Sequence, residues 1–441
     1  MNPAISKTVL QSFDKTVSCN CYYERPGELA ELQVRHDLPL IPRGGGMSYC
    51  SASALEGGLT LDMRSFNRIL NFDYKLGQVK VEAGICIGEL NNFLIPSGWQ
   101  LPVLPGYPMI TVGGCIAFNV HGKSQYKIGL FMDWIEQLTI YHPLKGELVC
   151  SATINEEIFN LTIGGMGFTG IIVNATLKLK KIAGNQVQIE ARKVGNIGEA
   201  VRLMKEKAYD YDYVYSWNNF NLSGRSFGKG IVYLEKIKNG FTESAKPVKF
   251  LNRLYPPRQG PPVLNRFTTY WMCQVYYQLS RLKPVSAIQN LYTASFPIYG
   301  KEVYYHLFGK KGFREYQVIF PHQNWEQAMS SIRELIRVYK MGIALASLKF
   351  FKGKTHHISF SGEGVCLALD IPNNQTSIDF FNALDQVTIR YNGIINPSKD
   401  SRAGAALVKA CYPGYEDFKR AINHYDPQRL FVSELRNRLE L

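Results

Sequence analysis

The stretch Arg43-Gly44-Gly45-Gly46-Met47-Ser48-Tyr49 decides the fold of this chain. It directly follows Leu38-Pro39-Leu40-Ile41-Pro42, a short apolar run that predicts a β-strand. Three consecutive glycines permit positive φ angles, and such a loop can turn several amide N–H groups toward one point, as a diphosphate requires. The stretch is not GxGxxG, and the strand–helix unit of a Rossmann fingerprint is absent around it. Taken alone, the triplet fits an ordinary turn equally well.

Three further glycine clusters follow in order along the chain. They are Pro105-Gly106 with Thr111-Val112-Gly113-Gly114, then Asn119-Val120-His121-Gly122-Lys123, and last Gly164-Gly165-Met166-Gly167-Phe168-Thr169-Gly170. Each cluster alone fits a turn, and His121 alone fits a structural histidine as well as a catalytic one. Four clusters in this order are much more specific, and they indicate a scaffold that surrounds a cofactor.

Short strands and helices are expected around these clusters. Period-two alternation predicts strands at 58–63, 78–84 and 171–179, while helical spacing predicts a helix over 87–97 that stops at Gly98. An amphipathic helix is expected from Pro427 to Leu441. Alternate aromatic residues predict one face of a strand, which belongs either to a sheet core or to a ligand wall: Tyr209, Tyr211, Tyr213, Tyr215 and Trp217.

Composition and charge narrow the class of protein. The 441 residues are 46% apolar and 20% charged, which excludes a disordered chain and predicts two or three domains. The net charge of +14 indicates an anionic partner, such as a nucleic acid, a phosphorylated substrate or lipid headgroups. Residues 201–300 hold 14 basic and 5 acidic residues, a net charge of +9. Four prolines within 255–262 predict a long loop beside this charge.

The cysteines and the apolar runs indicate where in the cell the protein is expected to lie. Nine cysteines show no zinc-site spacing, so no metal site is expected, and Cys19 and Cys21 form either a redox pair or, as their composition favours, neighbours on one strand. The N-terminus lacks a signal-peptide pattern, and no uncharged apolar run reaches the ~18–20 residues of a membrane span. We expect a cytoplasmic protein with reduced thiols that is at most peripheral to a membrane.

Together the four clusters resemble the FAD-binding domain of the vanillyl-alcohol-oxidase superfamily, of the p-cresol methylhydroxylase (PCMH) type. The resemblance narrows to the decaprenylphosphoryl-β-D-ribose 2′-oxidases at Val103-Leu104-Pro105-Gly106, Val120-His121-Gly122-Lys123, Ser398-Lys399-Asp400-Ser401-Arg402 and the tail from Asp426. It implies an α+β fold with a two-subdomain PCMH-type FAD-binding domain over 1–182. An inserted antiparallel-sheet substrate (cap) domain would span 183–393, and a C-terminal segment over 394–441 would complete the FAD domain.

The resemblance implies FAD as the cofactor. Other members attach FAD covalently through a histidine in the first glycine loop, and Met47 stands at that position here. A thioether cannot form that bond, so we expect non-covalent FAD. The cofactor-binding residues that the resemblance implies are Arg43, Gly44, Gly45, Gly46, Met47, Ser48, Tyr49, Gly106, Thr111, Val112, Gly113, Gly114, Phe118, Asn119, His121, Gly122, Ile171 and Asn396.

The family oxidises a sugar hydroxyl on a polyprenyl-phosphate carrier and passes a hydride to FAD. Such a reaction needs a group that takes the hydroxyl proton and a positive charge near the reduced flavin. Lys399 would be solvent-facing by default in its charged loop, and the family match assigns it to the substrate instead. The implied catalytic residues are Lys399, His121, Gln317 and Tyr49, and the implied substrate residues are Trp217, Lys349, Cys366 and Lys399.

Three departures leave the sugar and the lipid open. Ala368 and Cys366 stand where the mycobacterial enzymes have a cysteine and an asparagine, and Asn396 takes a flavin-proximal tyrosine position. The main prediction is an FAD-dependent oxidoreductase acting on CH–OH groups, which oxidises a lipid-linked sugar such as decaprenylphosphoryl-ribose in cell-envelope polysaccharide biosynthesis. An aldonolactone oxidase of the D-arabinono-1,4-lactone type is the alternative within the fold.

Further partners and classes follow from the same features. A keto product would suit an NAD(P)H-dependent reductase as a partner, and the charge suits a membrane surface. A nucleic-acid or membrane-binding module is a competing class, but RNA-recognition, KH and zinc motifs are missing from the sequence, so no nucleic-acid partner is expected. A degenerate flavoprotein that serves only as a partner subunit is the third class.

Overall fold

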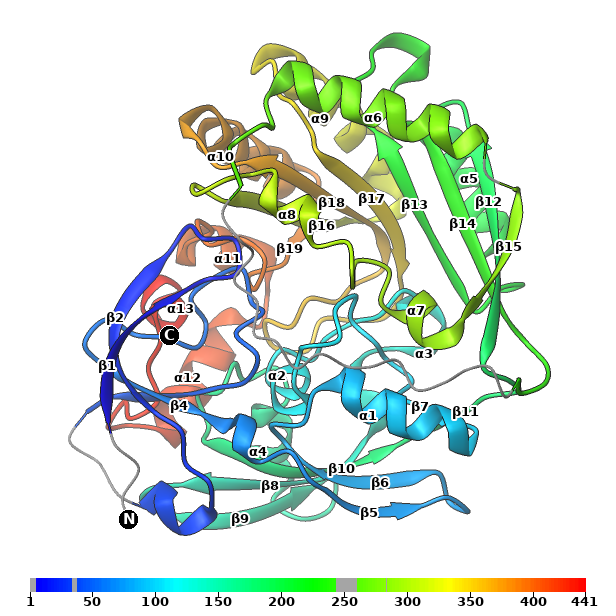
Figure 1. The fold of residues 1–441 in the computed structure, drawn as a ribbon. Coiled ribbons are helices and arrows are strands. Elements are labelled where there is room, and N and C mark those ends of the chain that lie inside the picture. The colour runs from blue at the N-terminus through cyan, green and yellow to red at the C-terminus, as the bar shows by residue number, and fades with distance from the viewer. Residues whose placement is uncertain (1–4, 34–37, 243–259, 283) are drawn as a thin grey trace.

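The computed structural model describes residues 5–33, 38–242, 260–282 and 284–441. In that part of the chain, helices combine with three larger sheets, most of whose strands are antiparallel (Figure 1). This is the α+β class that the family resemblance implies. The division of the chain into domains at 182 and 393 stays a prediction.

The first sheet has four strands in the order β1-β2-β4-β3. These strands are β1 (Ser6–Gln11), β2 (Ser18–Glu24), β3 (Leu40–Arg43) and β4 (Leu59–Asp62). Strand β3 runs parallel to β4 and leads straight into the first glycine loop.

The nine cysteines all lie in the described residues, where each is a free, buried thiol. Cys19 and Cys21 lie on one face of β2, which is the alternative that their composition favours.

The second sheet is antiparallel, with the order β5-β6-β10-β8-β9. Its strands are β5 (Ile69–Asp73), β6 (Gln78–Glu82), β8 (Ile135–His142), β9 (Gly146–Ser151) and β10 (Ile171–Lys178). The helices beside it are α1 (Ile87–Leu94), continued by η3 (Ile95–Ser97), α2 (Val112–Ala117) and α4 (Glu156–Thr162). A two-stranded ladder joins β7 (Trp99–Gln100) to β11 (Lys180–Lys181). Gly98 ends η3 with a φ of 82°, which confirms the predicted helix stop.

The third sheet has eight strands, and every neighbouring pair is antiparallel. In sheet order they are β15 (Ser286–Asn290), β12 (Gln186–Val194), β14 (Lys229–Lys238), β13 (Tyr213–Asn219), β17 (Leu345–Phe351), β18 (Gly364–Pro372), β16 (Phe313–Phe320) and β19 (Ile394–Ile395). The longer helices packed near it are α5 (Ile197–Lys207), α6 (Arg266–Arg281), α9 (Trp325–Val338) and α10 (Gln375–Arg390). Figure 1 shows this eight-stranded sheet above the first and second sheets.

Shorter elements connect these layers. They are η1 (Leu29–Gln33), η2 (Met63–Ser65), α3 (Gln125–Ile128), η4 (Phe131–Trp134), η5 (Gly224–Ser226), α7 (Leu291–Ser295), α8 (Val303–His306) and η6 (His322–Asn324). Of the helices in the described residues, none has both the length and the apolar character to cross a bilayer. The same residues contain no cluster of three or more His, Cys, Asp or Glu suited to a metal ion.

The expectation of one strand face from Tyr209 to Trp217 is corrected. Only Tyr213, Tyr215 and Trp217 belong to strand β13, while Tyr209 and Tyr211 precede it and Tyr209 is exposed. The predicted proline-rich loop over 255–262 lies outside the described residues as far as 259, and 260–262 form neither helix nor strand.

The C-terminus does not form the continuous helix expected from Pro427 to Leu441. It contains α11 (Ala405–Cys411), α12 (Tyr415–Tyr425) and only a five-residue α13 (Glu434–Arg438). The buried carboxylate of Asp426 accepts the amide N–H groups of Leu430 and Phe431, which folds this segment into a turn. The turn lets Leu430 O accept the amide of Leu40 at 2.7 Å, so the tail pairs with the strand before the first glycine loop.

The buried ion pair in this turn gives a stability prediction. Arg436 Nη1 lies 2.7 Å from Asp426 Oδ2, and both side chains are essentially inaccessible. Asp426→Asn leaves the Arg436 charge buried without its counter-ion, so we expect the free energy of unfolding to fall by about 3–5 kcal/mol. Urea denaturation measures this. The control is Asp417→Asn, because the Asp417–Arg420 pair is exposed and its loss is expected to cost less than about 0.5 kcal/mol. Equal, small effects from both variants would contradict the expected role of the pair.

Candidate active site

A cavity of about 330 Å³ lies between the glycine loops and one face of the eight-stranded sheet. Most of its lining comes from four parts of the chain: the loop 42–49, residues of the segments 105–107 and 110–121, the turn after α4, and the strands β16, β17 and β18 with the loop that follows β19. The cavity therefore gathers the whole of the first glycine cluster quoted from the sequence and residues from each of the other three.

The first glycine loop passes so close to its neighbours that side chains would not fit. A Cβ on Gly44 would lie 2.1 Å from Thr111 Oγ1, and a Cβ on Gly45 would lie 2.2 Å from the carbonyl oxygen of Met109. Real Cβ atoms essentially never approach other atoms this closely. Arg43 fixes the start of the loop, because its Nη1 donates to Ser53 Oγ at 2.9 Å. The loop is therefore held against the second glycine cluster with its backbone facing the cavity.

The donor groups of this loop fit the diphosphate of FAD. Among the residues that the structure describes, the amide N–H groups of Gly44 to Ser48 have no hydrogen-bond acceptor, although all five residues line the cavity. A Cβ on Gly106 would meet nothing within 4 Å, so the backbone there borders open space. Unpaired amides around a glycine-lined hollow are the chemistry that binds an anionic phosphate group.

Cross-strand register sets the chemistry of the opposite wall. Side chains alternate along a strand, and directly paired residues of neighbouring strands share a face of the sheet. Three consecutive rows on β16, β18 and β17 therefore face the glycine loops: Glu315, Asp370 and Leu345; Gln317, Ala368 and Ser347; and Ile319, Cys366 and Lys349. All of these residues except Ile319 and Cys366 line the cavity.

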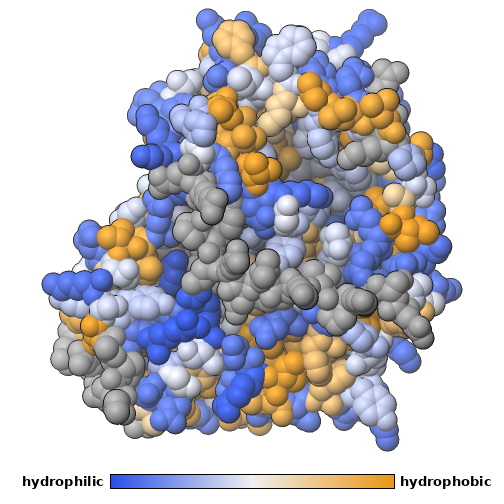
Figure 2. Space-filling model, in the orientation of Figure 1, coloured by the Kyte–Doolittle hydropathy of each residue, from blue (hydrophilic) through white to orange (hydrophobic). Residues whose placement is uncertain are grey.

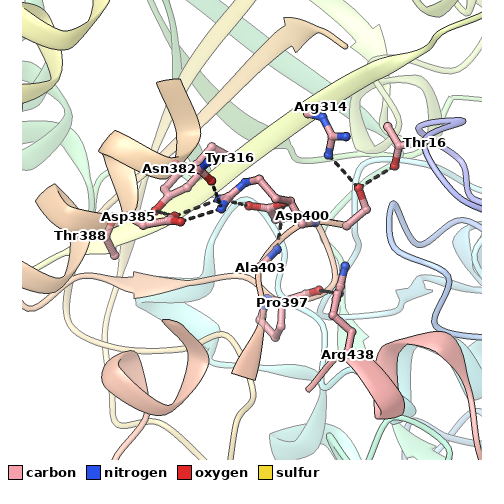
Figure 3. A network of polar contacts seen from close by, with 12 residues as sticks. Thr16, Arg314, Tyr316, Asn382, Asp385, Thr388, Pro397, Asp400, Ala403 and Arg438 are labelled. Carbon is pink, nitrogen blue, oxygen red and sulfur yellow. Dashed lines mark hydrogen bonds and ion pairs between the residues drawn. The ribbon is translucent and has the colours of Figure 1, made fainter. Parts of the chain in front are cut away.

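Lys399 lies in the loop after β19, and polar contacts fix this loop on one side through Arg402 (Figure 3). The Arg402 guanidinium bonds Asp385 Oδ2 at 2.6 Å and Asp400 Oδ2 at 2.8 Å. Asp400 Oδ1 in turn accepts the backbone amide of Arg402 at 2.8 Å. Asp385 also accepts the Tyr316 hydroxyl at 3.0 Å, so the loop is tied to strand β16.

On its other side the same loop is tied to the N-terminal part of the chain and to α13. Ser401 Oγ lies 2.6 Å from Thr16 Oγ1 and accepts Arg314 Nη1 at 3.2 Å. Arg438 Nη2 donates to the carbonyl oxygen of Pro397 at 3.5 Å. Figure 3 shows how these contacts surround the loop. A lysine on a charged loop, which by default would be solvent-facing, is thereby held at the cavity.

The Lys399 ammonium lies against an aromatic ring and a carboxylate. Its Nζ is 3.6 Å from the centre of the Tyr49 ring and 3.7 Å from Glu315 Oε1. Tyr49 stacks on Phe13 at 5.3 Å between ring centres, and burial raises the pKa of its phenol well above the ordinary value. Tyr49 therefore stays neutral, and Lys399 is the nearest positive charge to this part of the cavity wall.

Asn396 orients Gln317. The Asn396 side-chain amide donates to Gln317 Oε1 at 2.6 Å, and the Asn396 backbone amide donates to Gln317 O at 2.8 Å. Because its carbonyl oxygen accepts from Asn396, the orientation of the amide is fixed and its NH₂ group is turned toward other partners. One such partner is the thiol of Cys366.

His121 and Lys349 face the cavity from opposite walls. The His121 ring packs 4.8 Å from the Phe351 ring and 5.4 Å from the Phe360 ring. Burial, with smaller effects from Lys349 and Lys399, lowers the pKa of His121 well below the ordinary value, so its imidazole is neutral at neutral pH. Burial also lowers the pKa of Lys349.

Lys123, quoted in the third glycine cluster, does not line the cavity. Its Nζ lies 3.2 Å from Glu235 Oε2 on β14 and donates to Ala294 O at 2.7 Å. It also lies 4.6 Å from the centre of the Tyr215 ring. Part of the aromatic face of β13 therefore packs against a lysine that fastens the glycine loop to the sheet.

Five of the predicted site residues do not line the cavity. Strand alternation accounts for one of them, because Ile171 packs in the core beside Tyr141 and its neighbour Ile172 faces the cavity instead. Trp217 packs against α6, where the centre of its ring lies 4.7 Å from the centre of the Tyr276 ring. Cys366 packs in a hydrophobic cluster with Phe351. Val112 is buried in the core at the start of α2, and Gly122 lies against the backbone of Leu104.

The remaining predicted residues all line the cavity, and their roles stay predictions. The side chain of Asn119 is engaged elsewhere, since its Oδ1 accepts the amide of Met132 at 2.9 Å. Sequence reasoning missed Glu315, Asp370 and Tyr305, which also line the cavity. One signal could have found Glu315, because it precedes Gln317 by two residues in the same alternating run and must share its face.

An amide-lined glycine hollow that faces a wall carrying lysine and glutamine side chains is suited to a flavin-dependent oxidoreductase. The comparisons agree, since a family model described as an FAD binding domain matches residues 28–150. The chain is 27% identical to a decaprenylphosphoryl-beta-D-ribose oxidase from Mycolicibacterium smegmatis over 412 residues, covering 91% of this chain and 89% of that protein. The protein is an FAD-dependent oxidoreductase acting on CH–OH groups, with an FAD-binding domain of the PCMH type.

Two other relatives show how far the similarity extends. An uncharacterized protein from Streptomyces coelicolor is 24% identical over 386 residues, which is 81% of this chain and 100% of that protein. L-gulonolactone oxidase from Mus musculus is 30% identical over 174 residues, which is 38% of this chain and 39% of that enzyme.

Gly45 gives a direct test of the glycine hollow. We expect Gly45→Ala to lose most of its bound FAD, because the added methyl group would meet the Met109 carbonyl and push the loop out of place. Flavin absorbance per chain after purification measures this. Gly404→Ala is the control, since a Cβ there meets nothing within 4 Å. A Gly45→Ala protein with full flavin content would show that the close approach is not needed.

Proposed function

We propose that the protein oxidises a secondary hydroxyl of a sugar carried on a polyprenyl phosphate, such as the 2′-hydroxyl of decaprenylphosphoryl-ribose, to a ketone. One observation carries this choice: the similarity to decaprenylphosphoryl-beta-D-ribose oxidase covers 91% of the chain. It therefore includes most of the sheet that forms the cavity wall opposite the glycine loops. The keto product would suit an NAD(P)H-dependent reductase, and the activity would belong to cell-envelope polysaccharide synthesis.

When bound, FAD supplies a hydride acceptor at its N5 position. In the proposed reaction the protein's own residues orient the sugar and handle charge and proton. Lys399 provides a positive charge at the wall where negative charge develops, and the amide of Gln317 orients the sugar oxygens. Lys349 lies in the same wall and is suited to a phosphate oxygen of the carrier. Tyr49 and His121, both neutral at neutral pH, shape the site around the reacting carbon.

The arrangement of the elements supports the proposed domain division. The eight-stranded sheet begins at Gln186, close to the proposed boundary at 182, and its last strand β19 begins at Ile394, next to the boundary at 393. We also propose that FAD is bound without a covalent link, because Met47 occupies the relevant loop position and lines the cavity. Acid precipitation should then release the flavin into the supernatant.

The aldonolactone oxidase is the weaker candidate. The match to L-gulonolactone oxidase covers 38% of this chain, which leaves more than half of it unmatched. A small neutral lactone would also give Lys349 no anionic partner. A substrate panel separates the two candidates, since each predicts a different compound that reduces the flavin.

The test of the proposed function is anaerobic flavin reduction with this panel. We expect a polyprenylphosphoryl-ribose to bleach the flavin and aldonolactones to leave it oxidised. Lys399→Ala should keep its flavin absorbance and lose most of the reduction rate, by about 10²–10³-fold, as for loss of a charge-stabilising group. Lys409→Ala, an exposed lysine on α11, is the control and should retain the rate. Bleaching by lactones only would contradict the proposal.

We propose further that the enzyme meets its substrate at an anionic membrane surface through helix α6. The inner face of α6 packs on the sheet through Cys273 and Tyr277. Four large apolar residues repeat at every fourth position on its outer face and are between 52% and 76% exposed: Phe267, Trp271, Val275 and Leu279. Figure 2 shows hydrophobic side chains gathered over α6 at the top of the molecule. Exposed apolar stripes of this kind on basic segments are typical of interfacial helices.

Vesicle sedimentation tests the proposed membrane surface. We expect the protein to bind vesicles that contain anionic phospholipid, and Phe267→Ser with Trp271→Ser to weaken this binding at least tenfold without loss of flavin. The matched control is Tyr74→Ser with Leu76→Ser, which removes two equally exposed apolar residues from the turn between β5 and β6. An α6 variant that binds anionic vesicles as tightly as the wild type would overturn the proposal. So would a wild-type dimer that the variant breaks up, if neither the wild type nor the variant binds vesicles.

A further inference from the structure

Two carboxylates that face each other across the sheet stand beside Lys399. Strands β16 and β18 are antiparallel, and their register pairs Glu315 directly with Asp370. Both side chains are buried, with 7% and 2% of their surface exposed, and both line the cavity. Like charges directly opposite in a sheet are destabilising, so the strand pairing gains nothing from this pair.

The contacts of the pair leave one oxygen free. Asp370 Oδ2 accepts the Tyr304 hydroxyl at 2.9 Å. Within the described residues, Asp370 Oδ1 has no donor at all, although it is fully buried. Glu315 Oε1 lies 3.7 Å from Lys399 Nζ, which is a long distance for an ion pair. An acceptor oxygen that is buried without a donor is expensive, unless the opposite carboxyl group supplies a proton.

The electrostatic surroundings favour such a proton. Burial, together with the charge of Glu315, raises the pKa of Asp370 well above the ordinary value, whereas Tyr304 and Lys399 act in the opposite direction. The phenols of Tyr49 and Tyr305 also face the pair, and burial raises the pKa of both. Lys349 lies on the same face of the sheet, two rows away, and interacts with the charge of Glu315. Two carboxyl groups buried in one site favour a state in which one proton lies between them, because both cannot easily carry a charge.

We propose that Glu315 and Asp370 share one proton in the resting enzyme and that this pair accepts the hydroxyl proton of the substrate. The inference rests on the proposed alcohol oxidation. In the step, the substrate O–H and C–H bonds break and a C=O bond forms. The hydride leaves for the flavin, which is reduced, while the proton passes to the negatively charged carboxyl pair and neutralises it. Lys399, which faces Glu315, is not the proton acceptor in this step.

If the carboxyl pair accepts the proton, the two neutral side chains of the site, His121 and Tyr49, need not act as the base. The imidazole of His121 packs against two phenylalanine rings, and the phenol of Tyr49 would have to ionise in a buried place. The carboxyl pair already carries a negative charge at the cavity wall. It also lies one row from Gln317, which is proposed to orient the sugar oxygens.

Two isosteric variants test the role in catalysis. Glu315→Gln should keep full FAD content and slow anaerobic flavin reduction by about 10²–10⁴-fold, as for loss of a general base. Asp370→Asn keeps an acceptor for Tyr304 and should shift the pH profile of the reduction rate toward acid, because the proton is no longer shared with a second carboxylate. Glu326→Gln and Asp379→Asn, both exposed, are the matched controls. Near-normal rates in Glu315→Gln would overturn the catalytic part of the proposal.

Two measurements without substrate test the shared proton itself. Infrared spectroscopy of the wild-type holoenzyme at neutral pH should show the carbonyl stretch of a protonated carboxylic acid, and Asp370→Asn should lose it. Because the native state retains a proton that the unfolded chain releases, wild-type stability should fall as pH rises above the ordinary aspartate pKa. The melting temperature of Asp370→Asn relative to wild type should therefore increase with pH.

The outcomes separate this inference from the proposed function. A flavin that no sugar or lactone reduces would refute the proposed function, while the infrared band would still report on the shared proton. A substrate that is oxidised normally by Glu315→Gln would refute the inference and leave the proposed function standing. A wild-type spectrum without the band at neutral pH would refute the shared proton directly.

Discussion

The close approach of two backbone segments, the first glycine loop and the segment 109–111, is the constraint on which the site depends. Gly44 and Gly45 lie where any side chain would collide with Thr111 or with the Met109 carbonyl. Because the loop is packed this tightly, its amide groups are not used by the protein and are left facing the cavity. The C-terminal tail supports the same place, since Leu430 and Val432 pair with Leu40 just before the loop.

The opposite wall is determined by strand register rather than by loops. Period-two alternation turns Glu315 and Gln317 toward the cavity, and antiparallel pairing brings Asp370 and Lys349 onto the same face. The wall therefore combines an amide, a lysine and two carboxyl groups on rigid strands. Lys399 joins them from a loop that Arg402 and Ser401 hold in place from two sides. One side of the site is suited to bind the cofactor, and the other is suited to charge and proton chemistry.

Much of the fold and the cofactor side could be predicted from the sequence. Glycine triplets and pairs are local signals, and so are the helix stop at Gly98 and the strand at 171–178. What could not be predicted depends on tertiary contacts. The tail was expected to be a helix because its apolar spacing is helical, but Asp426 forms a turn through a buried pair with Arg436. Ile171 and Ile172 differ by one position in a strand, and only packing decides which one faces the cavity. The Glu315–Asp370 pair depends on register between strands that are about fifty residues apart.

The central claim is that the hollow between the glycine loops and the sheet holds one FAD per chain. The most direct measurement is to purify the protein, precipitate it with acid, and identify and quantify the flavin in the supernatant against the amount of chain. A release of FAD close to one molecule per chain is the result that the structure predicts. A colourless protein that also fails to take up added FAD would contradict it.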